Sequence, residues 1–440
     1  MHTSKRTRTL VLATAVAVVT SPMAAGCSAS QPGPTTTGDP GTVETTTITF
    51  WNGFTGPDGD VLTARVNAFN ESQSAYHVDM EIMPWDVLGQ KLLPALGAGQ
   101  GPNLSVGGIE SVGQNATSGA FANIDEFYEQ WDGAEQSALF PALLEGTKYD
   151  GHHYSAPMTF SPTLTFYNKT LFTEAGLDPE NPPVTWEEYR EAAIALTKDA
   201  DGDGQPEQYG FVTPDHIAPA VWEAFMWSNG GGSISADGKT STIQDPKSIE
   251  AVTYWAELLQ EHKTSPAGII GPDAEALFTA GKVGMLVAGP WMINGFKEAG
   301  LDFAVTSVPK GSAGAVPVVN SNQLLHSNDT LKSDAEKAGV WAFLQYWNSH
   351  ENQVAWSVGS GNPPTRQDVT QEEVAENEYM AMFLPFQNEA RVLLPNTTVF
   401  GDAIAIYENA MQKVTAKQGT PEEIMTAAGV EMQKLLDSQK

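Results

Sequence analysis

The stretch that decides the fold runs from Thr46 to Val106 and opens with TTITFWNGF at residues 46–54. Its first six residues alternate between polar and apolar side chains, which predicts a β-strand. Apolar residues at helical spacing predict helices over Asp60–Phe69 and Asp86–Leu96. Alternating apolar residues predict a strand over Tyr76–Met83, and a short buried strand is expected at Leu104–Val106. This β-α-β-α-β order implies a mostly parallel sheet, because parallel neighbours need a crossover between them.

The same rhythm returns after Leu164. We expect strands at 164–167, 283–287 and 303–308, and helices at 185–198 and 245–262. The helix at 185–198 opens with a capping box, in which Thr185 and Glu188 each bond the backbone of the other. From Ser333 onward we expect almost continuous helix, with breaks near 359–364 and 393–396. The chain therefore contains two α/β bodies and a helical tail, and segments 156–162 and 308–319 cross between the bodies.

The first 45 residues lie outside this pattern. Lys5, Arg6 and Arg8 precede an apolar run that is too short to span a bilayer, and small residues then lead into Cys27, which is the layout of a secretory signal. The segment resembles a bacterial lipobox, so we expect residues 1–26 to be removed. Cys27 would then carry a lipid at the outer face of the cytoplasmic membrane. The alternative is a free cysteine after an ordinary signal, which would expose a reactive thiol. Residues 27–45 then form a flexible tether rich in Ser, Thr, Pro and Gly.

Composition removes several classes of function. The 440 residues include 53 acidic and 23 basic side chains, and the formal net charge of −30 repels nucleic acids and anionic membranes. A single cysteine excludes an intramolecular disulfide framework and a multi-cysteine metal site. The sequence contains no motif of a serine hydrolase, a zinc protease, a P-loop or a dinucleotide-binding loop. No catalytic residue is therefore predicted.

One acidic loop matches the start of a calcium site. Oxygen-bearing side chains alternate through it, with Gly204 at the sixth position, and they are Asp199, Asp201, Asp203, Gln205 and Glu207. The twelfth position is Gly210 in place of the usual bidentate glutamate. An Asp/Gly-rich turn without metal is the simpler interpretation, and any bound calcium would be structural.

Several tryptophans lie next to Gly, Asn or Asp at the ends of predicted elements, namely Trp51, Trp85, Trp227 and Trp291. The carboxyl ends of parallel strands border the ligand crevice of an open α/β sheet. An aromatic face there can stack on a sugar ring, while Asn, Asp and Glu bind hydroxyl groups. By contrast, Trp186, Trp255, Trp341 and Trp347 lie on predicted helices and are expected to pack internally.

In a series of motifs the chain resembles the extracellular solute-binding proteins of ABC importers, in the maltose-binding and glycerol-3-phosphate-binding group. The motifs are ITFWNG at 48–53, LFTEAGL at 171–177, PVTWEE at 183–188, DGDG at 201–204, NGG at 229–231, FTAGKVGM at 278–285 with GPW at 289–291, and SGNPPTR at 360–366. They cover about 46–440 in the order of the family.

The resemblance implies a class II α/β clamshell whose two lobes are joined by hinge crossings and followed by a helical tail. The N-terminal lobe would comprise 46–157 and 318–360, and the C-terminal lobe 158–317 and 361–440. The ligand would lie between the lobes against Asn52, Phe54, Thr55, Glu110, Ser111, Phe160, His216, Trp222, Gly289, Trp291, Asn320, Asn362 and Phe400, to which we add Trp85 from its Pro-Trp-Asp turn. The resemblance also implies a monomeric, non-enzymatic receptor that closes on its ligand and docks on permease subunits.

These candidate residues favour a neutral sugar or oligosaccharide, because a phosphate group calls for Arg, Lys or a helix N-terminus. Arg366 is the exception, and its alternative role is a structural bond near Pro363 and Pro364. A receptor for glycerol-3-phosphate or a glycerophosphodiester stays open. Two other classes also stay open: a secreted carbohydrate-active enzyme, and a surface sensor or adhesin.

Overall fold

The computed structural model describes residues 45–212, 214–215, 218–314, 318–320, 323–383, 390–393 and 397–439. The predicted signal, the predicted lipid-attachment residue Cys27, almost all of the predicted tether and the site candidate His216 lie outside these residues. Among the described residues no helix is both long and apolar enough to cross a membrane.

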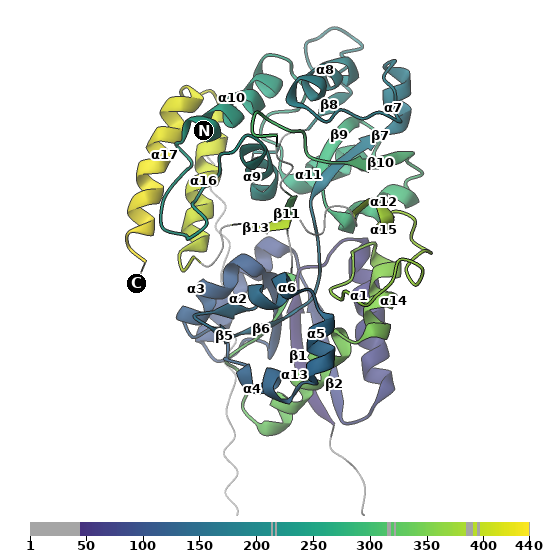
Figure 1. Cartoon of the computed structure of the whole chain (residues 1–440), viewed down its shortest axis with the longest axis vertical. Coiled ribbons are helices and arrows are strands. Elements are labelled where there is room, and N and C mark those ends of the chain that lie inside the picture. Colours follow the sequence, from purple (N-terminus) through teal and green to yellow (C-terminus); the bar gives the residue numbers. More distant parts are fainter. Residues whose placement is uncertain are drawn as a thin grey trace, which may run out of the picture. The chain divides into compact units, whose positions relative to one another are not determined.

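The first lobe is built on a five-stranded sheet with the order β2-β1-β3-β12-β6 (Figure 1). Its strands are β1 (Thr46–Asn52), β2 (Tyr76–Ile82), β3 (Leu104–Gly108), β6 (Ser155–Pro157) and β12 (Gln323–Ser327). The helices and short strands of this lobe are α1 (Pro57–Ser72), α2 (Trp85–Gly97), η1 (Ile109–Ser111), α3 (Val112–Thr117), α4 (Asp125–Gln130), α5 (Gly133–Ala138), α6 (Pro141–Gly146), β4 (Lys148–Tyr149), β5 (His152–His153), α13 (Asp334–Trp347) and α14 (His350–Ser360).

The second lobe is built on a four-stranded sheet with the order β10-β7-β9-β8. Its strands are β7 (Leu164–Asn168), β8 (Tyr209–Phe211), β9 (Val283–Ala288) and β10 (Phe303–Thr306). Its helices are α7 (Lys169–Glu174), α8 (Trp186–Leu196), α9 (Pro219–Ser228), α10 (Pro246–Gln260), α11 (Gly271–Thr279), η2 (Pro290–Met292), α12 (Ile293–Glu298), α15 (Met380–Phe383), α16 (Phe400–Thr415) and α17 (Pro421–Leu436). A separate pair, β11 (Val318–Asn320) and β13 (Ala390–Val392), is parallel.

The expectation of mostly parallel sheets was only partly right. In the first sheet β1 is parallel to β2 and β3, but β12 is antiparallel to both of its neighbours. In the second sheet β7 is antiparallel to both β9 and β10. The reversed strand of each sheet is the one that follows a crossing between the lobes. At β7 and β12 the chain arrives from the other lobe and enters the sheet at the end that faces the crossing. The direction of these strands therefore opposes that of their neighbours.

Local signals account for several helix starts. Thr185 and Glu188 form the predicted capping box at α8, and Thr420 and Glu423 form a second one at α17. Pro57 occupies the first turn of α1, where its missing N–H costs nothing. The predicted capping box at Thr185 is therefore confirmed. Strands at both ends of the crossing segment 156–162, β6 and β7, also agree with the sequence analysis.

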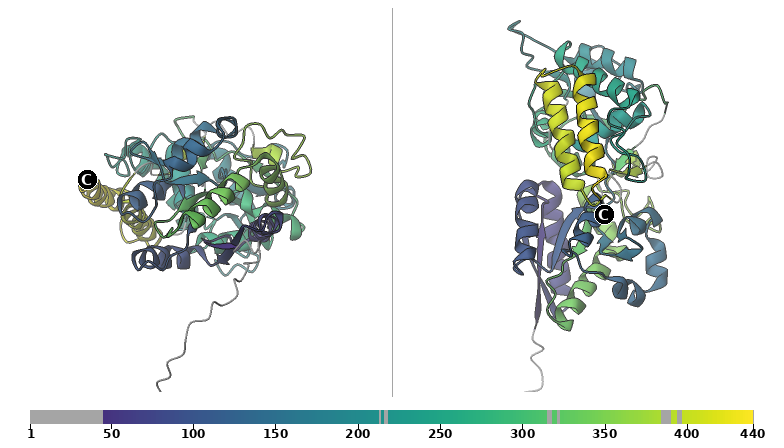
Figure 2. Two further views of the ribbon diagram at one scale, coloured as in Figure 1. Left: turned by 90° about the horizontal axis from the view of Figure 1, so that it is seen from below. Right: turned by 90° about the vertical axis from the view of Figure 1, so that its left-hand side faces the viewer.

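Apolar side chains form one core on each sheet and a further core under the C-terminal helices. Trp347 and Trp356 are fully buried in the first lobe. In the second lobe α16 and α17 lie side by side, as Figure 2 shows, and bury Tyr407 and Met432 in the same core as Trp255. Trp255 and Trp347 thus confirm their predicted packing roles.

The predicted helix break near 359–364 is confirmed, but the prediction of nearly continuous helix after it was wrong for 365–379, most of which forms turns and bends. Gly361 ends α14 in the left-handed conformation with φ of 79°. The two prolines that follow cannot continue a helix. The Thr365 amide then bonds the side chain of Gln353, at 2.9 Å. Side-chain bonds of this kind, next to α13 and α14, take the place of helical hydrogen bonds. The predicted boundaries of the two lobes are a separate point and remain a prediction.

Candidate functional site

A cavity of about 240 Å³ is lined by residues from both lobes. The first lobe contributes Glu110, directly after β3, and Gln323, the first residue of β12. In the sheet register Gln323 is paired with Gly108, which lies two residues before Glu110. The side chains of Glu110 and Gln323 therefore come from the same end of the sheet. The second lobe and the C-terminal helices contribute Thr163, Pro214, Ala218, Pro219, Ala220, Val221, Gly271, Ala274, Glu275, Leu286, Val287, Ala288, Trp291, Leu393 and Phe400.

Glu110 is the ionisable group of the first lobe at this cavity. The Glu110 carboxylate folds back over Gly108, where an added Cβ would lie only 1.8 Å from the carboxylate Oε1. Glycine at 108 therefore makes room for this conformation of the glutamate. Burial raises the pKa of Glu110 to about 7, because a charged carboxylate loses hydration there.

Glu275 and Trp291 form a polar pair that the second lobe contributes to the cavity. The indole Nε1 of Trp291 donates to Oε1 of Glu275 at 2.8 Å. Burial raises the pKa of Glu275, and the bond from Trp291 opposes that rise. The ring of Trp291 lies against Gly289, where an added Cβ would approach a ring carbon to 1.8 Å. The GPW motif therefore places an aromatic face in the cavity because its first residue has no side chain.

The rest of the wall is largely apolar. It is formed by the end of β9, by the first turn of α9 and by Phe400 at the start of α16. The lining residues that the structure describes include no Lys, Arg or His. Aromatic faces combined with carboxylate acceptors suit a ligand with apolar ring faces and hydroxyl or amino donors.

Three of the predicted site residues line this cavity, namely Glu110, Trp291 and Phe400. Gly289 lies directly beneath one of them. Ser111 follows Glu110, and its hydroxyl donates to the carbonyl of Gly108 at 2.8 Å, which stabilises the turn. The sequence reasoning therefore brought together the two aromatic residues and one of the two carboxylates.

Asn52 and Asn362 are buried and accept hydrogen bonds from neighbouring groups of the protein. The side-chain oxygen of Asn52 accepts the amide N–H of Phe54 at 3.1 Å. The side-chain oxygen of Asn362 accepts the hydroxyl of Ser161 at 2.9 Å. Neither asparagine is among the described lining residues of this cavity.

Trp222 does not have the predicted position. Its side chain is only 1% exposed, its Nε1 donates to the carbonyl of Pro214 at 2.6 Å, and its ring meets Tyr407 edge-on. Since α9 is surrounded by other elements, the middle of this helix is buried. Trp222 therefore belongs to the core and supports the wall residue Pro214 from behind.

The other predicted residues that the structure describes are not among the described lining residues of this cavity. Phe160 is buried and stacks on Phe140, Phe54 packs edge-on against Trp85, and Thr55 is exposed. Trp85 is 42% exposed above Gly53, so its face is open to solvent. Asn320 lies on β11, which pairs with β13. A ligand role for these residues remains a prediction.

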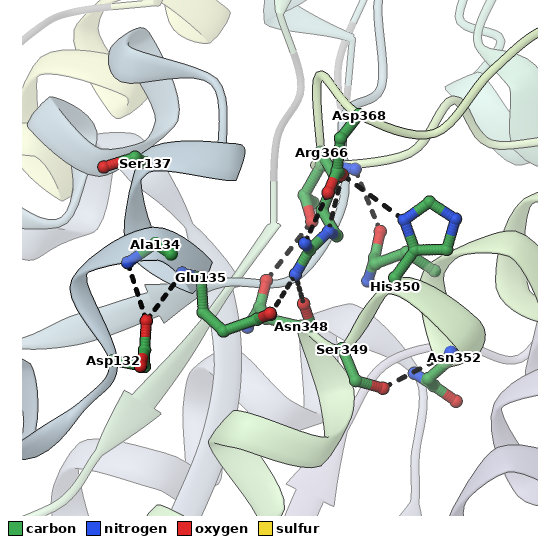
Figure 3. Close-up of polar contacts among 12 residues, drawn as sticks. Asp132, Ala134, Glu135, Ser137, Asn348, Ser349, His350, Asn352, Arg366 and Asp368 are labelled. Atoms are coloured by element: carbon green, nitrogen blue, oxygen red, sulfur yellow. Dashed lines mark hydrogen bonds and ion pairs between the residues drawn. The ribbon is translucent and has the colours of Figure 1, made fainter.

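Arg366 has the structural role that was its alternative (Figure 3). Its guanidinium donates to the carboxylates of Glu135 and Asp368 and to the carbonyl of Asn348, at 2.5, 2.7 and 2.9 Å. His350 lies beside the same group, with Nδ1 at 3.5 Å from Asp368. Because these bonds engage both terminal nitrogens of the guanidinium, Arg366 is not a free cation for a phosphate ligand.

Comparison with known proteins identifies the family. A model of the bacterial extracellular solute-binding proteins matches residues 64–382. This chain belongs to that family. A binding protein of Brucella abortus strain 2308 is 27% identical over 402 residues, which cover 89% of this chain and 92% of the relative. The galactooligosaccharide-binding protein of Bacillus subtilis is 32% identical over 225 residues, or 48% of each chain.

A glycerol-phosphate receptor also occurs among the relatives of this solute-binding protein. The sn-glycerol-3-phosphate-binding periplasmic protein of Agrobacterium fabrum is 23% identical over 340 residues, which cover 72% of this chain and 74% of the relative. The family is one of binding proteins, and its extracellular character means that the chain is exported.

Solved structures show the same two-lobed fold. The solute-binding protein of Thermotoga lettingae, bound to α-D-tagatose, has a TM-score of 0.80 and 23% identity over 89% of this chain and 100% of that one. The maltotriose-bound maltodextrin-binding domain of Bdellovibrio bacteriovorus has a TM-score of 0.78 and 22% identity over 89% and 98%. The fold expectation is thereby confirmed.

The acidic loop of this solute-binding protein brings three carboxylates together. Ligand atoms of Asp199, Asp201 and Glu207 all lie within 4.8 Å of one another. The same side chains already accept backbone amides, for example those of Gly202 and Gly204 on Asp199 at 2.8 Å. The loop therefore has internal bonds that hold its shape, and calcium binding stays a prediction.

Sequence reasoning missed Glu275, Thr163 and Gln323. Glu275 precedes Trp291 by 16 residues and looks like an ordinary polar residue on an amphipathic helix. Only the turn from α11 into β9 and η2 brings the two together. A glutamate one helical turn before the FTAGKVGM motif was the available signal, and it is weak because exposed glutamates are common on helices.

Proposed function

We propose that this solute-binding protein is the receptor of an ABC importer and binds a sugar or oligosaccharide without a phosphate group. The observation that carries the proposal is a cavity between the lobes with two aromatic side chains and two carboxylates. Aromatic rings stack on sugar faces, and carboxylates accept hydroxyl protons.

Charge argues against a phosphorylated ligand. Glu110 and Glu275 repel an anion, and Arg366 is engaged by Glu135 and Asp368. The formal net charge of −30 adds to the repulsion over longer distances. The glycerol-phosphate relative therefore supports the receptor role but not its ligand for this chain.

The remaining parts of the proposal concern delivery. The closed, ligand-bound chain would dock on permease subunits as a monomer, anchored through Cys27 and the tether. The lipid would hold one end of the chain at the membrane. The tether would then keep the globular unit, Glu44–Lys440, near the permease. No catalytic step is assigned to the protein.

A thermal unfolding screen tests the ligand class. Sugars, oligosaccharides, polyols, glycerol-3-phosphate and glycerophosphodiesters are added separately to the purified protein. A ligand at about 100 times its dissociation constant adds about 2.7 kcal/mol of stability. We expect a raised midpoint with at least one sugar. A shift only with phosphorylated compounds would refute the charge argument.

An enzyme is the second candidate, because two carboxylates line one cavity. A glycosidase places such a pair about 5–10 Å apart across its substrate. Incubating the protein with each stabilising sugar and analysing the products separates the two functions. We expect the sugar to be recovered intact, whereas steady release of shorter products would favour the enzyme.

A further inference from the structure

The carboxylates of the cavity lack a positive partner among its described lining residues. Glu110 reaches the cavity from the first lobe and Glu275 from α11. Asp58, in the first turn of α1, is 5% exposed, and its pKa is raised to about 7 mainly by burial and to a minor extent by the charge of Glu275. Carboxylates that share a poorly hydrated region favour the arrival of an opposite charge.

The hydrogen bonds seen at these groups leave that charge uncompensated. Glu275 accepts the N–H of Trp291 at 2.8 Å, which is a neutral donor. Burial raises the pKa of Glu110 and of Glu275, so both sites hold a proton more tightly than in water. An opposite charge placed within about 4–6 Å would instead stabilise the charged form of each carboxylate.

The cavity also offers a suitable surface for a cation. The face of an indole ring attracts ammonium groups, and Trp291 is part of the wall. Two cations elsewhere in the second lobe and its flanking segments have other partners, since Lys297 lies over the ring of Tyr379 and Arg366 is held by Asp368. No described lining residue therefore supplies a positive charge, and a positively charged ligand would supply one.

We propose that the cavity takes an amine-bearing sugar, in which a protonated amino group replaces a hydroxyl and is bound by Glu110 and Glu275. An ammonium group has three N–H donors and can serve both carboxylates, while the sugar ring stacks on Trp291. This inference rests on the proposed function and refines its ligand from sugars in general to amino sugars.

Matched ligand pairs test the inference by calorimetry near neutral pH. The pairs are glucosamine with glucose, galactosamine with galactose, and the β-1,4-linked glucosamine disaccharide with cellobiose. Within each pair, every amino group of the first sugar stands where the second sugar has a hydroxyl group, and the rest of the molecule is the same. Hydrogen bonds to a charged group are the stronger kind, so we expect the amine of at least one pair to bind about 10-fold more tightly.

Two variants remove the charge but keep the shape. Glu110→Gln and Glu275→Gln should each reduce the preference for the amine several-fold, with a smaller change for the neutral partner. Glutamine at 275 retains an oxygen that can accept the N–H of Trp291. Glu71→Gln, at an exposed position of α1, is the control and should leave the preference unchanged. Unfolding curves of all three variants show whether each is folded.

The outcomes separate the inference from the function on which it rests. If the neutral sugar of a pair binds at least as tightly as its amine, or if the preference survives in both glutamine variants, the amino-sugar inference is overturned and the sugar receptor stands. If no member of any pair binds, the amino-sugar inference is overturned, and the proposed function fails as well only if no sugar of the thermal screen raises the unfolding midpoint.

Discussion

Trp291 contributes a ring face to the cavity and an N–H to Glu275, so its removal should affect binding directly. We expect Trp291→Ala to weaken sugar binding by about 1–3 kcal/mol, the range found when stacking on an aromatic platform is lost. Titration calorimetry with the best ligand of the screen measures the change. Unchanged affinity would remove Trp291 from the site.

Trp222 provides the contrast, because it is fully enclosed by α9, Tyr407 and Pro214. Trp222→Ala should lower the free energy of unfolding by about 3–5 kcal/mol, the cost of a large cavity in a core. Chemical denaturation measures that loss. A variant of native stability with lost affinity would restore Trp222 to the ligand surface.

Gly289 is required by the ring that lies against it. A methyl group at this position would overlap the ring of Trp291, with 1.8 Å between the added Cβ and a ring carbon. Gly289→Ala should therefore displace the indole and weaken sugar binding about 10-fold or more, as a loss of part of the stacking would. Calorimetry gives the affinity and indole fluorescence reports the displacement.

Gly89→Ala is the matched control for that variant. An added Cβ at Gly89, in the middle of α2, meets no atom within 4 Å. It should leave binding unchanged and stabilise the protein by about 0.5–1 kcal/mol through the higher helix propensity of alanine. Equal loss of affinity in both glycine variants would contradict the steric argument.

At the residue scale, the predictable part of the site was the part encoded in contiguous motifs. Trp291 and Gly289 stand together in GPW, and Glu110 follows a strand whose end could be located. Glu275 was not predictable in this way, because its bond to Trp291 depends on how α11 packs. Trp222 was misplaced because sequence spacing does not show which face of α9 other elements cover.

The elements themselves were largely readable from the sequence. Alternating and helical periods located β1, α1, β2 and α2 to within a few residues. Strand direction was less accessible, since β7 and β12 each enter a sheet from a crossing and run against it. The segment 365–379 was wrongly predicted as helix because its shape comes from long-range bonds such as those of Arg366 with Glu135.

Arg366 joins α5 to the end of α13, so its loss should act on stability. Its side chain is 3% exposed and faces Glu135 and Asp368. The carboxylates of Glu135 and Asp368 are 46% and 45% exposed and can be hydrated when the cation is lost, so Arg366→Met should cost about 1.5–3 kcal/mol of unfolding free energy, the range for hydrogen bonds to charged groups. Urea denaturation measures this cost. A stable variant that has lost ligand affinity would instead place Arg366 in the binding site.

His350 should make the neighbouring segment sensitive to pH. The carboxylate of Glu373, at 2.8 Å, raises the pKa of His350 above its ordinary value of 6.5. The Thr370 amide and His350 together lower the pKa of Glu373 from 4.5 to about 2. The histidine contribution is complete below its unfolded pKa and is lost as pH rises through the raised one. The glutamate contribution is complete above its unfolded pKa and is lost as pH falls towards 2.

The pair therefore stabilises the protein most between about pH 4.5 and 6.5, the two unfolded pKa values. His350→Gln should lower the thermal midpoint in that window and make little difference at pH 8 to 9. Thermal unfolding of native protein and variant across this range measures the difference. A gap that grows with rising pH would contradict the assigned direction.

At the scale of the whole molecule, the cavity wall belongs to both lobes, and this links binding to lobe movement. A ligand that contacts Glu110 from the first lobe and Trp291 from the second gains both contacts only when the lobes are close. It can shift the lobe equilibrium only through that difference in contacts. We therefore expect saturating ligand to reduce the radius of gyration of Glu44–Lys440, measured by X-ray scattering, and Trp291→Ala to need more ligand for the same change. If ligand binds with native affinity and the radius stays constant, binding involves one lobe alone, and a closure-based signal to the permease would have no structural basis.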